Sequence, residues 1–194
     1  MSSRRLLQLI LLVQALFAAG IALAAVHWLD VAPWQGILLG LAAVVLVRLA
    51  INANNFLLSA RVASPTPPAF QLGVPGQLRM MAEEFMTSMR VTSWHMPRAR
   101  PHIRIYPDAA LPPVLLLHGY GCNSGYWAHL VPLLDAARIS HATLDLEPLT
   151  GDIDGYAAQI EQGVQALCAR AGAGQAAIVA HSMGGMAARA WMRA

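Results

Sequence analysis

Two long apolar stretches near the N-terminus constrain this chain most, because such stretches are buried only in a membrane or in a protein core. The first, Leu6 to Leu29, has two glutamines and one histidine as its only strongly polar side chains. It exceeds the ~20 residues that a helix needs to cross the hydrocarbon core. The second, Trp34 to Ile51, is interrupted only by Arg48, whose long side chain can reach back to the headgroups. We predict a hairpin of two transmembrane helices.

The distribution of arginines predicts how this hairpin is oriented. Arg4 and Arg5 precede the first stretch, Arg48 and Arg61 accompany the end of the second, and the turn between them carries Asp30 and no arginine. The positive-inside rule therefore puts both ends in the cytoplasm, with the bacterial inner membrane as the expected location. The alternative is that the first stretch is a signal peptide and the second a soluble core helix, which would put the remainder in the periplasm.

Composition excludes some functions. All 13 basic side chains are arginines, and no cluster is longer than Arg4-Arg5, so we expect no nucleic-acid partner. Cys122 and Cys168 are too few for a disulfide framework and are expected to be free thiols. We expect neither a cofactor nor a metal.

The segment after the second stretch is predicted to be a connector. Ser64 to Gly76 is rich in proline and glycine and marks a boundary. Residues 77–90 then have apolar side chains on one helical face, at Leu78, Met81, Phe85 and Met89. We favour a helix packed on its own domain over a membrane-surface helix or lid, because Glu83 and Glu84 would be repelled by anionic lipid. The predicted domains are the anchor (1–60), the linker with its amphipathic helix (61–99) and an α/β domain (100–194).

From Pro112 onward the pattern alternates between strands and helices. Strands are expected at 113–119, 139–148 and 175–182, and a further short strand at 100–107. Helices are expected at 123–137, with Asn123 or Ser124 as N-cap, at 154–172, between Asp154 and Gly172, and from 183 onward. This order predicts a parallel sheet with covering helices.

Two groups of residues that could take part in catalysis directly follow strands of this predicted sheet. Ligands of such sheets bind at this position. One is "HGYG", His118 to Gly121, and the other is "AHSMGG", Ala180 to Gly185. A serine that turns sharply from strand to helix needs small neighbours, which here are Ala180 and Gly184. The amides of Met183, at the helix start, and of Tyr120, in the glycine-rich turn, can together form an oxyanion hole.

These motifs resemble the α/β-hydrolase superfamily, specifically its bacterial lipase- and esterase-like members, over Pro101 to Ala194. The resemblance implies an α/β fold, namely the N-terminal part of an α/β-hydrolase preceded by the two transmembrane helices. It also implies Ser182 as the nucleophile and the backbone N–H groups of Tyr120 and Met183 as the oxyanion hole. The remaining implied roles are support of the oxyanion loop, by His118, Gly119 and Gly121, and formation of the nucleophile turn, by Ala180, His181 and Gly184.

The family's catalytic order is serine, then an acid, then histidine, and no Asp, Glu or His follows Ser182. Asp145 and Glu147 end a strand on the correct side of the sheet, but the family does not normally draw its acid from there. We therefore expect the front part of a longer hydrolase, truncated after the nucleophile turn and inactive alone. The strand before Ser182 would then be an exposed apolar edge that favours self-association.

Three functional hypotheses remain open. The first is a membrane-anchored serine hydrolase that cleaves carboxylic esters, with a lipid or another small apolar ester as substrate. The second is a non-catalytic membrane protein whose half-domain binds a partner through the open edge. The third is a small membrane protein whose helical hairpin is itself the functional part.

Overall fold

The computed structural model describes residues 1–194, which form two compact units. One unit combines Met1–Gln8 with Val91–Ala194, and the other is Leu9–Arg90. The helix α1 (Ser3–Trp28) begins in the first unit and continues into the second. The domain boundaries that we expect near residues 60 and 99 stay predictions.

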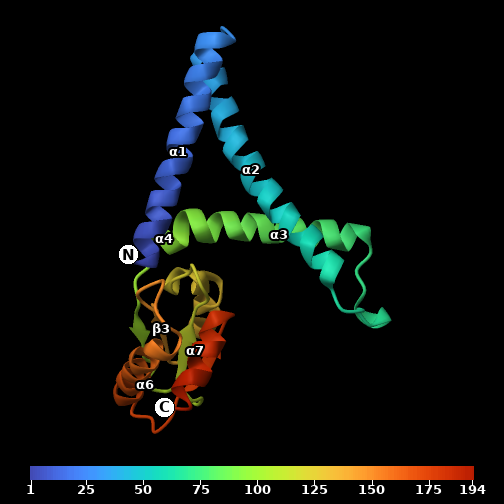
Figure 1. The fold of residues 1–194 in the computed structure, drawn as a ribbon. Helices are drawn as coiled ribbons and strands as arrows, with labels where there is room; N and C mark the ends of the chain where they lie inside the picture. The colour runs from blue at the N-terminus through green and yellow to red at the C-terminus, as the bar shows by residue number, and fades with distance from the viewer. The chain divides into compact units, whose positions relative to one another are not determined.

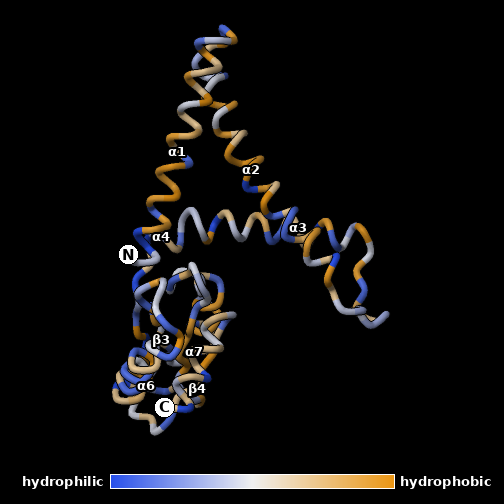
Figure 2. The backbone as a smooth tube through the Cα atoms, in the orientation of Figure 1, coloured by the Kyte–Doolittle hydropathy of each residue, from blue (hydrophilic) through white to orange (hydrophobic).

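The second unit contains an antiparallel hairpin of α1 and α2 (Pro33–Val62), as Figure 1 shows. Both helices are long and apolar enough to cross a membrane, and their apolar character runs along most of their length (Figure 2). Their large apolar side chains are mostly outside, for example Leu23 at 71% and Leu46 at 62% exposure. The second apolar stretch is thus not the buried core helix of a soluble domain in this structure.

Small residues let the two helices of the hairpin approach closely. A Cβ atom added to Gly36 would lie 2.7 Å from the backbone oxygen of Ala22, and one added to Gly40 would overlap the backbone of Ala18. Close backbone approach at small residues is the usual basis of helix packing in membranes. Glycine at these two positions therefore fixes where α2 crosses α1.

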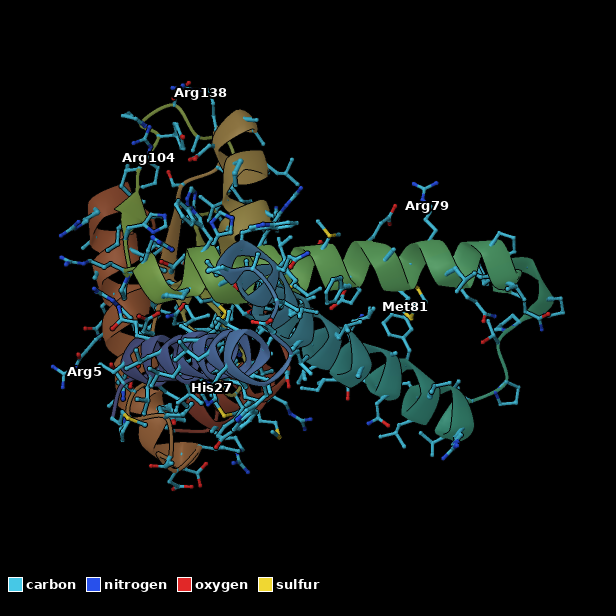
Figure 3. The ribbon with its side chains drawn as sticks, turned by 90° about the horizontal axis from the view of Figure 1, so that it is seen from above. Arg5, His27, Arg79, Met81, Arg104 and Arg138 are labelled. Carbon is cyan, nitrogen blue, oxygen red and sulfur yellow. The ribbon has the colours of Figure 1, made fainter.

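The helix α3 (Val74–Arg90) crosses α2 at the level where α2 becomes polar, and the Asn52 side-chain amide donates to the backbone oxygen of Met81 at 3.3 Å. Arg79 and Met81 project from opposite sides of α3, with Met81 on the side of α2 (Figure 3). The helix begins three residues earlier than predicted, so Pro75 lies in its first turn. Proline is tolerated there because the missing N–H would have no helical acceptor. The connector before it contains only the short 3₁₀ helix η1 (Pro68–Phe70).

The first unit is built on a four-stranded sheet of β1 (Ile103–Arg104), β2 (Val114–Leu117), β3 (His141–Leu144) and β4 (Ala177–Ala180). The strand order is β1-β3-β2-β4, with β2, β3 and β4 parallel and β1 antiparallel to β3. The predicted α/β architecture is confirmed, as a mixed sheet with flanking helices. The wholly apolar run of β2 is buried because it lies between two neighbours and under helices.

Helices α6 (Ala157–Ala171) and α7 (Met183–Trp191) pack against each other and against the sheet (Figure 1). Their core cluster includes Leu115 and Leu117 of β2, which face the same side, and Ile160 and Leu167 of α6. Gly172 ends α6 in the left-handed conformation, as predicted, with a φ of 63°. Asp154 does not cap this helix: it begins a 3₁₀ turn, η4 (Asp154–Tyr156), in which no side-chain cap bond forms.

The predicted helix at 123–137 is divided into a 3₁₀ helix, η3 (Ser124–His129), and a short helix, α5 (Val131–Ala136). Pro132 explains the break, since a proline fits only the first turn of a helix. The predicted cap is confirmed, because the Asn123 side chain accepts from the amide of Gly125 at 2.9 Å.

The start of α1 belongs to the first unit. Leu7 packs with Val91 and Met96, which lie in the π-helical turn η2 (Val91–His95) and the short helix α4 (Met96–Arg98). The Gln8 side-chain amide donates to the backbone oxygen of Pro97 at 3.0 Å. The backbone amide of Ser3 donates to the Glu147 carboxylate at 2.9 Å. Residues 91–98 therefore hold the first two turns of α1.

Candidate active site

Ser182 occupies the sharp turn between β4 and α7. Its backbone has a φ of 54° and a ψ of −124°, and it is one of only three non-glycine residues with positive φ. Such a conformation costs about 1–3 kcal/mol in a residue with a side chain and persists only where the surroundings enforce it. The residue is exposed to solvent. The strand-to-helix turn predicted from the sequence is therefore present.

The turn is enforced by close packing around Gly184. A Cβ atom there would lie 2.6 Å from the backbone oxygen of His118 and 2.7 Å from that of Leu117. The first turn of α7 thus lies directly on the end of β2, and only glycine fits. Gly185, by contrast, has nothing within 4 Å of an added Cβ atom.

The glycine-rich turn after β2 lies beside Ser182. A Cβ atom on Gly119 would lie 3.1 Å from the Cβ atom of Ser182 and 3.0 Å from Nδ1 of His181. The turn itself is closed by a hydrogen bond from the amide of Cys122 to the oxygen of Gly119 at 3.2 Å, with Gly121 at a φ of 72°. The fold therefore brings together the two motifs singled out in the sequence, although residues 122–179 lie between them in the chain.

Two backbone amides in the two turns at Ser182 have no backbone acceptor. Met183 begins α7, so its amide has no helical acceptor, while the next two amides bond back to His181 and Ser182 at 3.0 and 2.9 Å. Tyr120 follows Gly119 directly, and its amide also donates to no backbone oxygen. Unpaired N–H groups on either side of a serine can stabilise a negatively charged oxygen formed there.

His118 is almost fully buried, at 1% exposure, and both of its ring nitrogens contact backbone groups. Nε2 accepts from the amide of Leu146 at 3.0 Å, so the ring proton is on Nδ1, which donates to the oxygen of Gly119 at 2.9 Å. Burial lowers the pKa of His118, against the opposing effects of the Gly119 carbonyl, Asp145 and Glu147. This neutral imidazole ties the turn after β2 to the end of β3 and has no free nitrogen with which to accept a serine proton.

His181 lies at the surface next to the candidate nucleophile, with its ring stacked on Tyr126 at a centroid distance of 4.5 Å and an angle of 26°. Tyr126 is the residue near the site that sequence reasoning missed. It was expected on a regular helix, and the 3₁₀ geometry of η3 changes which way its side chain points. No feature of the amino-acid sequence indicates the contact between Tyr126 and His181.

The two acids considered from the sequence are engaged with backbone groups. Asp145 accepts from the amide of Ser124 at 2.6 Å and lies 4.0 Å from Nε2 of His118. Glu147 accepts from the amide of Ser3. Neither carboxylate contacts His181, so no acid–histidine–serine relay is assembled from these residues.

The strand that leads into Ser182 forms an edge of the sheet. Ala177, Val179 and Ala180 are exposed, with Val179 at 41%. An exposed apolar edge offers unpaired backbone groups to another strand. The small side chain of Ala180, expected for the nucleophile turn, lies at the end of this edge.

Neither the curated proteins nor the solved structures gave a match. Residues 114–194, which run from β2 through the His118–Gly121 turn and Ser182 to the end of α7, match the model described as the alpha/beta hydrolase family. This match supports assignment of residues 114–194 to the α/β-hydrolase superfamily.

Proposed function

We propose that this protein is a membrane-anchored serine hydrolase that cleaves carboxylic esters, with Ser182 as its nucleophile. The observation that carries the proposal is the strained turn at Ser182, held by Gly184 on one side and bordered by Gly119 on the other. A fold retains such strain where a reactive group must stand clear of the backbone. The family match supports hydrolase chemistry in general, and the ester substrate is our inference from the resemblance to lipases and esterases.

In the proposed reaction, the Ser182 hydroxyl oxygen attacks the ester carbonyl carbon and loses its proton to a base. The carbonyl oxygen becomes negatively charged and accepts hydrogen bonds from the amides of Tyr120 and Met183. Collapse of this intermediate breaks the ester bond and releases the alcohol, which takes up the proton. Water then cleaves the acyl-serine and releases the acid. None of these proposed reaction steps uses a cofactor or a metal.

The residues around Ser182 do not form a base with an orienting acid in this structure. His118 is occupied at both nitrogens, and His181 has no carboxylate partner. Without them, the residual acceleration from backbone donors and binding is about a thousand-fold over water, against about a million-fold more with a full triad. This chain should therefore hydrolyse a nitrophenyl ester very slowly.

The membrane hairpin supports a substrate that partitions into lipid. The exposed leucine, valine and isoleucine side chains of α1 and α2 cannot remain in water as an extended surface. We propose that they insert in the bacterial inner membrane with the hydrolase unit on the cytoplasmic side, as the arginine distribution indicates. If α2 does not span, the unit lies in the periplasm.

Imidazole rescue tests the nucleophile. Added imidazole can replace a missing base, so it should raise nitrophenyl-ester hydrolysis by the detergent-solubilised chain above the rate of imidazole alone. Ser182→Ala should abolish this gain, whereas Ser64→Ala, in the exposed connector, should keep it. A gain that is equal in Ser182→Ala would rule out Ser182 as the nucleophile.

The exposed β4 edge favours a second candidate function, in which the half-domain binds a partner strand without catalysis. The same edge could pair two copies of the chain. Val179→Lys places a charge on this edge, and it should lower the apparent mass in detergent if the edge pairs. A normal imidazole gain together with an unchanged monomeric mass would leave the enzyme as the better assignment.

A further inference from the structure

We propose that a pocket of the first unit, distinct from the surroundings of Ser182, binds the phosphate of an anionic phospholipid headgroup. The pocket has a volume of about 340 Å³ and lies between residues 94–102 and the η3–α5 segment. Its polar lining consists of His95, Arg98, Arg100, His102 and Ser124, and no Asp or Glu contributes to it. A concave surface with this charge selects an anion.

Both guanidinium groups lack an acidic partner. The ion pairs of the structure involve Arg79, Arg138 and Arg193, and none involves Arg98 or Arg100. Two unpaired guanidinium groups in one pocket repel each other unless an anion lies between them. Guanidinium groups also match phosphate oxygens in geometry, through paired N–H donors.

Arg98 is held in position before any ligand binds. Its guanidinium carbon lies 3.7 Å from the centre of the Trp94 ring, and Nη1 donates to the backbone oxygen of Trp94 at 3.2 Å. The Nε and Nη2 donors have no partner and remain for a ligand. Holding one donor group in place reduces the entropy that binding must overcome.

The two walls of the pocket are fixed to each other. The Asn123 side-chain amide donates to the backbone oxygen of Met96 at 2.8 Å, and a Cβ atom on Gly125 would lie 2.6 Å from the Cα atom of Met96. The Ser124 hydroxyl in the wall is buried and has no hydrogen-bond partner. The hydrogen bond and the close packing at Gly125 therefore hold the two walls in place before any ligand binds.

The wall of this pocket also contacts a residue at the start of the first apolar stretch of the chain, which the proposed hairpin would insert in the membrane. Gln8 donates to the oxygen of Pro97, the residue before Arg98, and Leu9 continues α1 into its apolar part. Trp94 is 60% exposed beside Arg98, and a tryptophan with a cation is typical of the headgroup region. If the hairpin inserts as proposed, lipid headgroups surround the residues next to Leu9, which favours a headgroup over free phosphate as the ligand.

The pocket also shares an element with the candidate active site. Ser124 and Gly125 of η3 line the pocket, whereas Tyr126 of the same 3₁₀ helix stacks on His181 next to Ser182. A lipid held by its headgroup would therefore lie close to the element that borders the nucleophile. Binding itself requires no catalysis, so it can be tested without assuming the proposed hydrolase activity.

The test is isothermal titration of the full chain in a non-ionic detergent with dihexanoyl phosphatidylglycerol, dihexanoyl phosphatidylcholine and inorganic phosphate. We expect the phosphatidylglycerol to bind more tightly than the other two. The double variant Arg98→Gln/Arg100→Gln should weaken its binding about tenfold or more, because it removes charge-assisted hydrogen bonds. The matched control Arg61→Gln/Arg170→Gln loses the same charge outside the pocket and should bind as the natural chain does.

Three other outcomes would each contradict a part of the proposal. Equal binding of phosphatidylglycerol and phosphatidylcholine would overturn the anionic pocket. Equal weakening in the control variant would show attraction by net charge alone and overturn it as well. Inorganic phosphate that binds as tightly as the lipid would overturn the headgroup assignment. Unchanged circular dichroism of both variants excludes unfolding as the cause, and Ser182→Ala should bind normally, which separates this result from a failure of the hydrolase proposal.

Discussion

At the scale of single residues, Gly184 and Gly185 are neighbours with different surroundings, so the effect of adding a methyl group can be compared between them. A methyl group at 184 would meet the backbone oxygens of Leu117 and His118, whereas one at 185 would meet open space. Gly184→Ala should therefore lower the free energy of unfolding by about 1–3 kcal/mol, as overpacking does. Gly185→Ala should leave it unchanged or raise it by up to about 1 kcal/mol, because alanine favours the helix. Urea unfolding measures both, and equal effects would contradict the packing described here.

His118 predicts a pH dependence of stability. Because burial lowers its pKa in the folded chain, the unfolded chain takes up a proton first as the pH falls below the ordinary value of 6.5. The contribution of His118 is thus complete above that value and is lost progressively below it. Urea midpoints of the natural chain should fall between about pH 7.5 and pH 5 more steeply than those of His118→Gln. Parallel pH profiles would show that His118 does not titrate with unfolding.

The residue types around Ser182 were predictable from the sequence, because each has a local structural reason. A sharp turn needs Gly184, and the glycines after β2 allow the chain to reverse beside Ser182. The contacts of Tyr126 and Asp145 were not predictable in the same way. They join η3 to the ends of β3 and β4, so they depend on tertiary packing that no local pattern encodes.

At the scale of helices and strands, the close contact of α1 and α2 gives the next prediction. Gly40→Leu would force a side chain into the backbone of Ala18 and should separate the helices, whereas Gly20→Leu meets open space. Nitroxide labels are attached to Leu12→Cys and Val47→Cys in a chain with Cys122 and Cys168 replaced by serine. Pulsed electron paramagnetic resonance in lipid nanodiscs then measures the distance between the two labels. We expect a longer or broader distance distribution for Gly40→Leu only. The same distribution in both leucine variants would mean that the helices do not pack at Gly40.

Elements with a strong periodic or apolar pattern were predicted well, and their ends were not. The buried strand β2 and the helix α6 follow from apolar runs and from the glycine that ends the helix. The helix α2 continues beyond Ile51 to Val62, because asparagine and serine weaken a helix without breaking it. The division of 123–137 at Pro132 had a visible cause in the sequence, but whether a proline bends a helix or restarts it depends on packing.

At the scale of the whole molecule, the least predictable feature is the association of Met1–Gln8 with residues far along the chain. In the sequence, this segment is notable only for Arg4 and Arg5, which predict the membrane orientation. In the structure, Ser3 also contacts Glu147, Leu7 contacts Met96, and Gln8 contacts Pro97. Such contacts join segments separated by about half the chain or more, and neither composition nor periodicity signals them. They link the first helix of the hairpin to the unit that contains Ser182.

If the hairpin inserts in a membrane as proposed, its orientation decides on which side of the membrane that unit lies. Moving an arginine into the centre of a bilayer costs about 2.5–3.5 kcal/mol, so the arginines at the outer ends of α1 and α2 should stay in the cytoplasm and the turn near Asp30 should cross. Asp30 itself has a φ of 52°, and we therefore place the reporter on its exposed neighbour, as Leu29→Cys with both natural cysteines replaced by serine. An impermeant maleimide should label Leu29→Cys from outside intact spheroplasts, whereas Asp152→Cys, exposed in the hydrolase unit, should react only in inverted vesicles. If both cysteines react from outside, α2 does not span and the unit lies in the periplasm; if Leu29→Cys reacts only from the cytoplasmic side, the inserted hairpin itself is wrong.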